Sequence, residues 1–283
     1  MNQPLKETVY SAESGLKSGT IFKEIIDGWI SSFSLGKQLF LRNFRSQYRQ
    51  SFLGVLWSII PPLLTAGVWI FLNGQSIINI EQPGVPYPAF ILTSTMLWAL
   101  FGMSLQMPMN ALQGSRSLLV KLNFPRESVL VAGLLQILVD MGIRIGLIII
   151  VFIVFQVTPG LSLVYAPLGL LMLMMLGFTL GLLITPLSML YNDVSRFVGA
   201  FLPFWMLLTP VIYPNPRAGL GEILNRYNPV SPILSTTRDW IFDNEPTLLI
   251  EFMIMSALVL VLFIIGNMIL KLSMTVIIER IGS

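Results

Sequence analysis

The stretch "LLIEFMIMSALVLVLFIIGNMIL", residues 248–270, decides the class of this protein. It contains one charged side chain, Glu251, and its length exceeds the roughly 20 apolar residues that a helix needs to cross a membrane. The whole chain has the same character, because 54% of its 283 residues are hydrophobic and only 11% are charged. Soluble domains carry roughly 25% charged residues. The sequence therefore predicts an integral membrane protein.

Five further apolar stretches meet the same criterion, so we expect an all-α membrane protein with six transmembrane helices. The expected spans are 53–72, 87–107, 128–156, 162–190, 195–213 and 248–270. A polar tail (1–20) and an amphipathic helix (21–50) precede a transmembrane domain (51–275), and 276–283 form the C-terminus. Two polar segments interrupt that domain, at 108–127 and 214–247.

Lysine and arginine are concentrated in the segments on one side of these spans. Thirteen of the 17 lie there: Lys6, Lys17, Lys23, Lys37, Arg42, Arg45, Arg49, Arg116, Lys121, Arg126, Arg196, Lys271 and Arg280. The opposite side holds only Arg217, Arg226 and Arg238. Cytoplasmic loops carry the excess of positive charge. We therefore expect both termini and the segment 108–127 in the cytoplasm, and the segment 214–247 outside.

Residues 21–50 have an amphipathic pattern that is too charged for a span. The apolar side chains at helical spacing are Phe22, Ile25, Ile26, Trp29, Ile30 and Phe33. This pattern is typical of a helix that lies in the membrane interface, with Arg42, Arg45 and Arg49 placed to bind lipid phosphates. The alternative is a helix that packs on protein.

Two spans carry residues that are unusual in lipid. Pro61 and Pro62 fall at mid-depth of the first span, where we expect a kink. Gln136, Asp140 and Arg144 share one face of the third, and a charge there costs about 2.5–3.5 kcal/mol. Asp140 and Arg144 either line a hydrated translocation path or form a structural ion pair.

The segment 214–247 contains two short amphipathic pieces separated by "NPVSP". Because prolines bound them, we expect a re-entrant helical hairpin on the outer side, a conformation that is tolerated only where protein or water surrounds the backbone. The alternative is an ordinary outer loop with surface helices.

Catalysis within this chain is disfavoured by its composition. It has no cysteine, no histidine and no G-x-x-x-x-G-K-[ST] loop, so we expect neither a metal nor a cofactor to bind here. The alternative from another class is an integral membrane enzyme acting on lipid-linked sugars. Its candidate acids would be Asp140, Asp193 and Asp239.

Several strings occur together in a recognisable order. They are "RNFRSQYRQSFLGVLWSIIPPL" (42–63), "GVPYPAFILTSTMLWALF" (84–101), "LLVKLNFPRESVLVAGLLQILVD" (118–140), "YNDVSRFV" (191–198), "TPVIYP" (209–214) and "NRYNPVSPILSTTRDWIF" (225–242). By these strings the chain resembles the membrane subunit of ABC-2 type polysaccharide exporters. That family moves O-antigen, teichoic acid and capsule chains across the bacterial cytoplasmic (inner) membrane.

The resemblance implies a transport subunit rather than an enzyme. It implies a homodimer joined to two copies of a cytoplasmic ABC ATPase, which binds the ATP and Mg²⁺. The implied substrate is a polysaccharide on polyprenyl pyrophosphate, held among membrane lipids, with no role for nucleic acid. A permease for a smaller lipid or drug is the alternative within the same fold.

The resemblance also assigns roles to residues of this sequence. "LLVKLNFPRE" (118–127) would be the coupling contact with the ATPase, although a basic loop resting on anionic lipid is the alternative. The coupling residues are Leu119, Lys121, Leu122, Phe124, Pro125, Arg126 and Glu127; the lateral gate for the lipid headgroup is Trp29, Arg42, Arg45 and Arg49. The channel residues are Trp57, Trp98, Phe101, Asp140 and Arg144; the outer gate is Tyr213, Asn228, Pro229 and Arg238.

Overall fold

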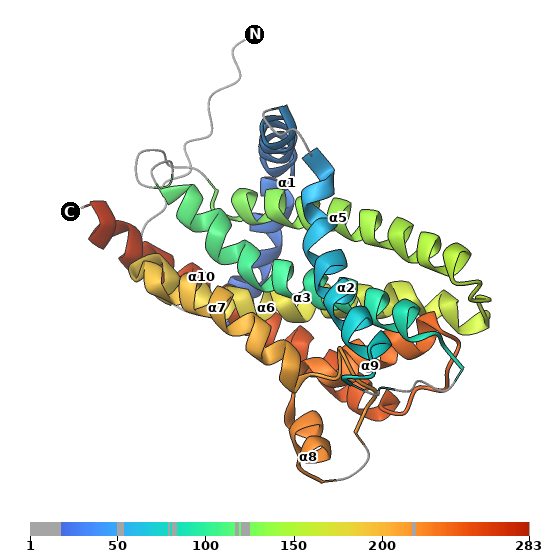
Figure 1. The fold of residues 1–283 in the computed structure, drawn as a ribbon. Helices are drawn as coiled ribbons and strands as arrows, with labels where there is room; N and C mark the ends of the chain where they lie inside the picture. The colour runs from blue at the N-terminus through green and yellow to red at the C-terminus, as the bar shows by residue number, and fades with distance from the viewer. Residues whose placement is uncertain are drawn as a thin grey trace.

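The computed structural model describes residues 18–49, 54–78, 80, 84–116, 119, 125–216 and 219–282, and every regular element within these ranges is helical (Figure 1). The elements are α1 (Ser18–Arg49), η1 (Gly54–Ser58), α2 (Ile60–Gly74), α3 (Tyr87–Gly114), α5 (Glu127–Val154), η2 (Leu161–Tyr165), α6 (Ala166–Leu190), α7 (Asn192–Leu208), α8 (Gly219–Tyr227), α9 (Val230–Ile241) and α10 (Leu249–Gly282). The all-α fold expected from the sequence is confirmed.

Five segments of the described chain are long and apolar enough to cross a membrane: Leu56–Gly74, Tyr87–Gly114, Glu127–Val154, Leu161–Leu190 and Leu249–Met274. The chain is therefore a multi-pass membrane protein. The remaining expected span, 195–213, corresponds to α7, which has 17 residues. Such a helix is about 25 Å long, against a hydrocarbon core of about 30 Å. The count of six spans stays a prediction.

Proline explains why α7 ends earlier than expected. Thr209 has an extended backbone, with φ −103° and ψ 141°, and Pro210 follows it. The proline ring disfavours the helical conformation in the residue before it, so the helix ends at Leu208. A turn through Pro210 and Val211 then leads into the segment that carries α8 and α9.

The bounds of the first two spans also differ from the expectation. Pro61 and Pro62 do not kink a span at mid-depth; they occupy the first turn of α2, where their missing N–H groups have no partner to lose. A short 3₁₀ turn, η1, precedes them. The next span, expected at 87–107, continues as α3 to Gly114 with Pro108 inside the helix. The segment expected between the second and third spans is therefore shorter than 108–127, because residues 108–114 belong to α3.

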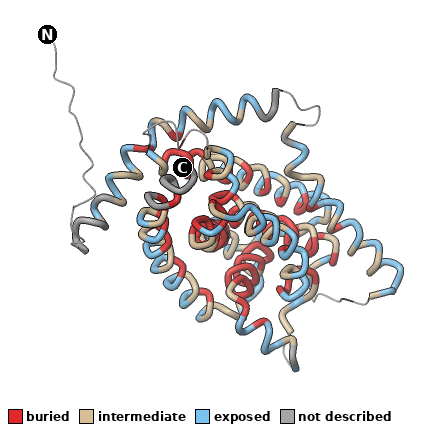
Figure 2. The backbone as a smooth tube through the Cα atoms, turned by 90° about the vertical axis from the view of Figure 1, so that its left-hand side faces the viewer, coloured by how far each residue is buried: buried red, intermediate tan, exposed pale blue. Residues whose placement is uncertain are grey.

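Helices α3 and α6 form the centre of the bundle. Most residues of both helices are buried, Figure 2 shows the buried residues concentrated in the interior of the bundle, and α3 packs on α6, α5, α2 and α7. The contact between α3 and α6 is close because small residues face it. A Cβ at Gly177 would lie 2.6 Å from the carbonyl oxygen of Phe101, and one at Gly181 would overlap that of Leu105. This Gly-x-x-x-Gly spacing is a known device for bringing membrane helices together.

Helix α1 packs on α5 by the same device. Gly28, Ser32 and Gly36 recur at every fourth position, and Ser32 is fully buried. A Cβ at Gly36 would lie 2.6 Å from the side chain of Val131, so the two helices cross in near backbone contact. The opposite face of α1 is exposed and apolar, with Ile30 at 70% and Phe33 at 54% accessibility. The alternative of a helix packed on protein therefore holds for one face of α1, and the placement of the other face in the membrane interface stays a prediction.

We expect Gly181→Val to destabilise the protein, because the new side chain would push α6 away from α3. Overpacking a tight contact typically costs about 1–3 kcal/mol. The matched control is Gly146→Val in α5, where no atom lies within 4 Å of the position that a Cβ would take. Thermal unfolding in detergent should show a lower midpoint for the first variant only. Equal midpoints would contradict the close α3–α6 contact.

Candidate functional site

Trp29 fixes α1 to the helices beneath it. Its indole Nε1 donates a hydrogen bond of 3.0 Å to Oδ1 of Asn267 in α10. Its ring meets that of Phe178 edge-on, with centroids 6.3 Å apart. Trp29, Arg126, Glu127, Asn267 and Lys271 line one shallow pocket, which we name the α1–α5–α10 junction. Trp29 therefore lies beside two residues of the expected coupling segment.

The four residues expected at the lateral gate are not together. Arg42 and Arg45 are exposed on α1, whereas Trp29 lies 13 residues earlier, which is about 20 Å along a helix. Arg42 donates to the side chain of its neighbour Asn43 at 3.2 and 3.3 Å. The side chain of Arg49 lies outside the described residues. Trp29 and the two exposed arginines therefore lie at separate places along α1, and the lateral gate that the four residues would form stays a prediction.

The structure describes only part of the expected coupling segment. Lys121, Leu122 and Phe124 lie outside the described residues. Leu119 is buried, with 6% accessibility, so it packs in the core of this subunit and is not free to enter a groove of a partner. Pro125 is exposed, and Glu127 begins α5. Burial lowers the pKa of Arg126, and the adjacent carboxylate of Glu127 opposes this shift.

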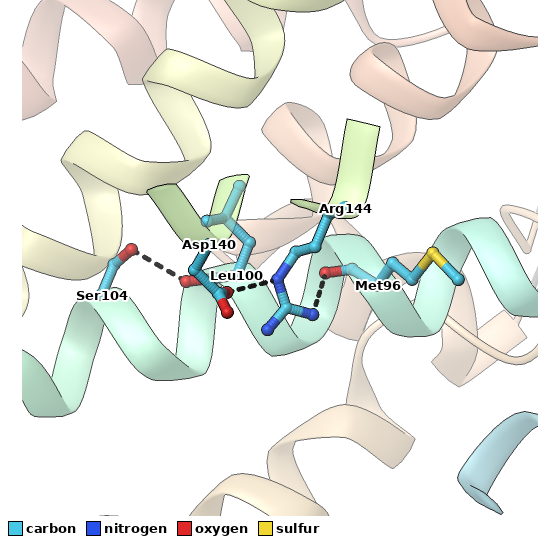
Figure 3. A network of polar contacts seen from close by, with 5 residues as sticks. All are labelled: Met96, Leu100, Ser104, Asp140 and Arg144. Carbon is cyan, nitrogen blue, oxygen red and sulfur yellow. Dashed lines mark hydrogen bonds and ion pairs between the residues drawn. The ribbon is translucent and has the colours of Figure 1, made fainter. Parts of the chain in front are cut away.

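Asp140 and Arg144 form a buried ion pair one turn apart on α5 (Figure 3). Nε of Arg144 donates to the Asp140 carboxylate at 2.7 Å, and Nη1 reaches the carbonyl oxygen of Met96 in α3 at 3.4 Å. The two residues are 2% and 6% accessible. Side chains so enclosed do not line a hydrated path in this conformation, which contradicts their assignment to a channel. The pair joins α5 to α3.

Two of the three expected channel aromatics are also enclosed. Phe101 has no accessible surface and Trp98 has 7%. Both rings pack edge-on against Trp205 of α7, with centroids 5.3 and 6.2 Å away. They hold α7 on α3 and cannot line a channel, whereas Trp57 in η1 is 59% accessible. Periodicity could not make this distinction, because it does not tell which neighbour an apolar face meets.

Asn228 joins the end of α7 to the start of α9. Its Oδ1 accepts hydrogen bonds from Nε1 of Trp205 at 3.2 Å and from the backbone N–H of Val230 at 3.1 Å. Its Nδ2 donates to Oγ1 of Thr209 at 2.8 Å. Pro229 immediately precedes α9, and the Tyr213 hydroxyl donates to the carbonyl oxygen of Leu207 at 2.9 Å. Three of the expected outer-gate residues therefore gather where α7 and α9 meet.

Arg238, the fourth, is buried inside the protein, and no carboxylate of the described residues is bonded to it. Its Nη1 donates to the carbonyl oxygen of Pro210 at 2.5 Å and to Oγ of Ser94 at 3.4 Å. The guanidinium lies 4.3 Å above the ring of Phe90. Burial lowers the pKa of Arg238 to about 10, and the charge of Asp239 opposes that shift, so the guanidinium stays protonated at neutral pH. Arg238 thus ties α9 to α3 and to the turn after α7.

The expected hairpin consists of α8 and α9, but only α9 is packed. Nearly all of α9 is buried against α6, α10 and α3. Helix α8 extends from the bottom of Figure 1, far from the C-terminal end of α10, and exposes Ile223, Leu224 and Tyr227. The two short helices are present as expected, whereas their re-entry into a membrane stays a prediction.

A large cavity lies beside these two helices, with a volume of about 910 Å³. We name it the α8–α9 cavity. Its charged and amide residues come from α8, α9, the start of α10 and the loops between them. They are Asn215, Glu222, Asn225, Arg226, Arg238, Asp239, Asn244, Glu245 and Glu251. Of these, the sequence singled out Arg238 for the outer gate and Asp239 as a candidate acid, and nothing in the pattern shows that the rest converge on them.

The structure also bears on the enzyme alternative. Asp140 is paired inside the bundle, Asp193 is exposed beside Arg196 at the start of α7, and Asp239 faces the α8–α9 cavity. The three candidate acids therefore lie on three different helices in separate places. No cluster of three or more acidic residues within the described residues could hold a metal ion. An acid–base pair does not assemble from these residues.

A second polar contact fixes the C-terminal end of α9 to η2. The Asp243 carboxylate accepts hydrogen bonds from the hydroxyl of Ser162 at 2.7 Å and from its backbone N–H at 3.1 Å. These bonds hold the pKa of Asp243 below its ordinary value. The contact therefore stabilises the fold above the ordinary pKa range of aspartate, and this stabilisation is lost as the pH falls through the lowered value.

We expect Asp243→Asn, which keeps a residue type that tolerates the positive φ of 55° at this position, to lower the thermal midpoint at neutral pH, by an amount that shrinks as the solution is acidified. The difference from the wild type should stay constant between about pH 7 and 5 and decline below about pH 4. Thermal unfolding at a series of pH values measures it. A difference that persists at pH 3 would show that the carboxylate contact is not its cause.

Asn228→Ala should destabilise the junction of α7 and α9, because Trp205 and Thr209 lose a buried partner. Leaving buried polar groups unpaired costs about 1–3 kcal/mol. The control is Asn192→Ala, at an exposed asparagine. Protease sensitivity of the segment between α7 and α9 should rise in the first variant alone. Unchanged protection in Asn228→Ala would contradict the central role of this side chain.

Comparison with known proteins identifies the family of this chain. Residues 35–242 match the family described as ABC-2 type transporter. The O-antigen export system permease protein RfbA of Klebsiella pneumoniae is 24% identical over 201 residues, which cover 70% of this chain and 76% of that protein. The protein of the same name from Myxococcus xanthus is 26% identical over 176 residues, covering 61% of this chain and 65% of its own length. With a match over most of its length and an all-helical, multi-span fold, the chain belongs to the ABC-2 type transporter family of membrane permeases.

Proposed function

We propose that this chain is the permease subunit of an ATP-driven exporter that carries a polysaccharide on polyprenyl pyrophosphate across the bacterial cytoplasmic membrane. The family supports transport, and the similar proteins are named as O-antigen export permeases. The observation that carries the proposal is the placement of α1, which presents arginines and apolar residues to its surroundings while its other face is fixed on α5.

The exposed face of α1 has the chemistry of a lipid headgroup site. Ile30 and Phe33 would enter the interface, and Arg42 and Arg45 are exposed further along the same helix. Guanidinium groups bind phosphate oxygens through paired hydrogen bonds. A pyrophosphate-linked substrate entering from the membrane would therefore meet α1 first.

Helix α1 also lies beside the end of the proposed coupling segment, on which an ATPase would act. Helix α5, on which α1 packs, begins at Glu127, directly after the proposed coupling segment. Movement of that segment would reach α1 through Arg126 and Glu127 at the α1–α5–α10 junction. Two copies of an ABC ATPase, which hold ATP and Mg²⁺, and a homodimer of this chain complete the proposed exporter. By the charge distribution, both termini and this junction face the cytoplasm.

We expect the wild type to co-purify with its proposed ABC ATPase partner, and Phe124→Ala/Arg126→Glu to weaken that complex at least about tenfold, because a charge contact becomes repulsive. ATPase turnover should rise with lipid-linked glycan in the wild type and not in the double variant. The control is Arg196→Glu, an exposed charge reversal outside the segment.

Two results would contradict the proposal. One is equal binding of the ATPase to the wild type and the double variant, which would mean that the ATPase contact lies outside 118–127. The other is normal surface glycan in cells that lack the permease, which would remove the export function itself.

A further inference from the structure

The α8–α9 cavity lies at the end of the bundle that the charge distribution places outside the cell. Its volume of about 910 Å³ is within the range of ligand sites, which is roughly 300–1,000 Å³. The walls come from the start of α3, the turn at 214–216, α8, α9 and the start of α10. None of its residues takes part in the α1–α5–α10 junction. It also contains no residue of α1, which carries the proposed headgroup site, so the cavity is distinct from both.

The charges that line the cavity exclude one class of ligand. Among the described residues that line the cavity, four carboxylates (Glu222, Asp239, Glu245 and Glu251) accompany two guanidinium groups (Arg226 and Arg238). This excess of negative charge repels phosphates and uronic acids. The charges are also of both signs, so a ligand must offer hydrogen-bond donors to the carboxylates and acceptors to the guanidinium groups.

Two buried side chains in the cavity wall have unused hydrogen-bonding capacity. Asn225 is 6% accessible, and its Oδ1 has no partner among the described residues. Buried amide oxygens are rarely left unpaired in folded proteins. Arg238 is 3% accessible, and both of its hydrogen bonds within the described chain use Nη1. The Asn225 oxygen is itself enclosed, so it would reach a ligand in the cavity only when α8 shifts, whereas Arg238 adds unused donor N–H groups at the same wall.

A sugar hydroxyl answers both requirements, because it donates one hydrogen bond and accepts others. Each ring of a neutral polysaccharide carries several such groups, and its C–H faces can rest on the apolar part of the wall formed by Phe242 and Leu248. We propose that the α8–α9 cavity binds an uncharged stretch of polysaccharide on the outer side of the membrane. This inference rests on the proposed function and narrows its substrate to a glycan without phosphate or carboxylate groups in the bound units.

Binding at this position would follow transport. The cavity is at the end of the bundle opposite the proposed coupling segment, so a chain would reach it only after crossing. A held glycan could not slide back while the ATPase is reset. Helix α8 contributes Glu222, Asn225 and Arg226. Among the described elements its main neighbours are α7 and α9, and it is more exposed than α9, so it can adjust to the ligand more readily.

The test is direct binding to the full chain in lipid nanodiscs, without the ATPase. The probe would be an array of neutral, uronic-acid, phosphate-bearing and amino oligosaccharides, with a lysine-rich peptide as a further ligand. The oligosaccharides would have about four to eight units, so that their size is comparable with that of the cavity. We expect the neutral oligosaccharides to be retained. Asn225→Leu and Glu222→Gln should each weaken their binding about tenfold.

Two further variants make the result interpretable. Glu222 is exposed, so its replacement tests the cavity even where Asn225→Leu fails to fold. The control is Asp193→Asn, which removes a carboxylate from the exposed start of α7, outside the cavity. Its binding should equal that of the wild type. Glu222→Gln/Glu245→Gln should also admit acidic oligosaccharides that the wild type rejects, because it removes half of the carboxylates.

Several results would overturn the inference. They are preferential binding of acidic oligosaccharides, retention of the basic peptide alone, no retained glycan, or variants that bind as the wild type does. None of these removes the proposed function, which fails separately if cells without the permease still export their surface glycan. The binding array and the export assay therefore distinguish the two failures.

Discussion

Close backbone contact at small residues holds this bundle together. Within a membrane, lipid tails are as apolar as leucine, so burial of apolar surface gives helices little reason to associate. The central contact instead depends on Gly177 and Gly181, which let α6 approach the backbone of α3. Gly36 serves the same purpose where α1 crosses α5. Because the rest of the bundle packs around these two crossings, the position of α1 and of the α8–α9 cavity depends on them.

Buried polar contacts then fix the register that close packing permits. Arg144 joins α5 to α3, Asn228 joins α7 to α9, and Arg238 joins α9 to α3. Each contact is strong in a medium of low dielectric constant, and each would be costly to break, because the freed group has no water to bind. Residues that first suggest a hydrated path in the sequence therefore act mainly as connections between helices in this conformation.

The sequence predicted the helical class, most spans and the two short outer helices, because long apolar runs and prolines determine them locally. It could not place side chains that depend on three-dimensional packing. Phe101 and Trp98 looked available for a channel, yet Trp205 of α7 encloses them. Gly28, Ser32 and Gly36 recur at every fourth position, and this spacing indicates a face that packs closely on another helix. The apolar periodicity of 21–50 does not include these residues, so it did not predict the contact with α5. No local pattern in the sequence indicates that acidic residues converge around the α8–α9 cavity.

The most direct test of the central claim is ATP-dependent movement of glycan in proteoliposomes that contain the permease and its ATPase. Glycan linked to polyprenyl pyrophosphate would be supplied on the side that carries the ATPase, and a glycosidase enclosed on the other side would report its arrival. The account predicts cleavage only when ATP, Mg²⁺ and both proteins are present. Cleavage without the ATPase, or no cleavage in the complete system while ATP is hydrolysed, would contradict the account.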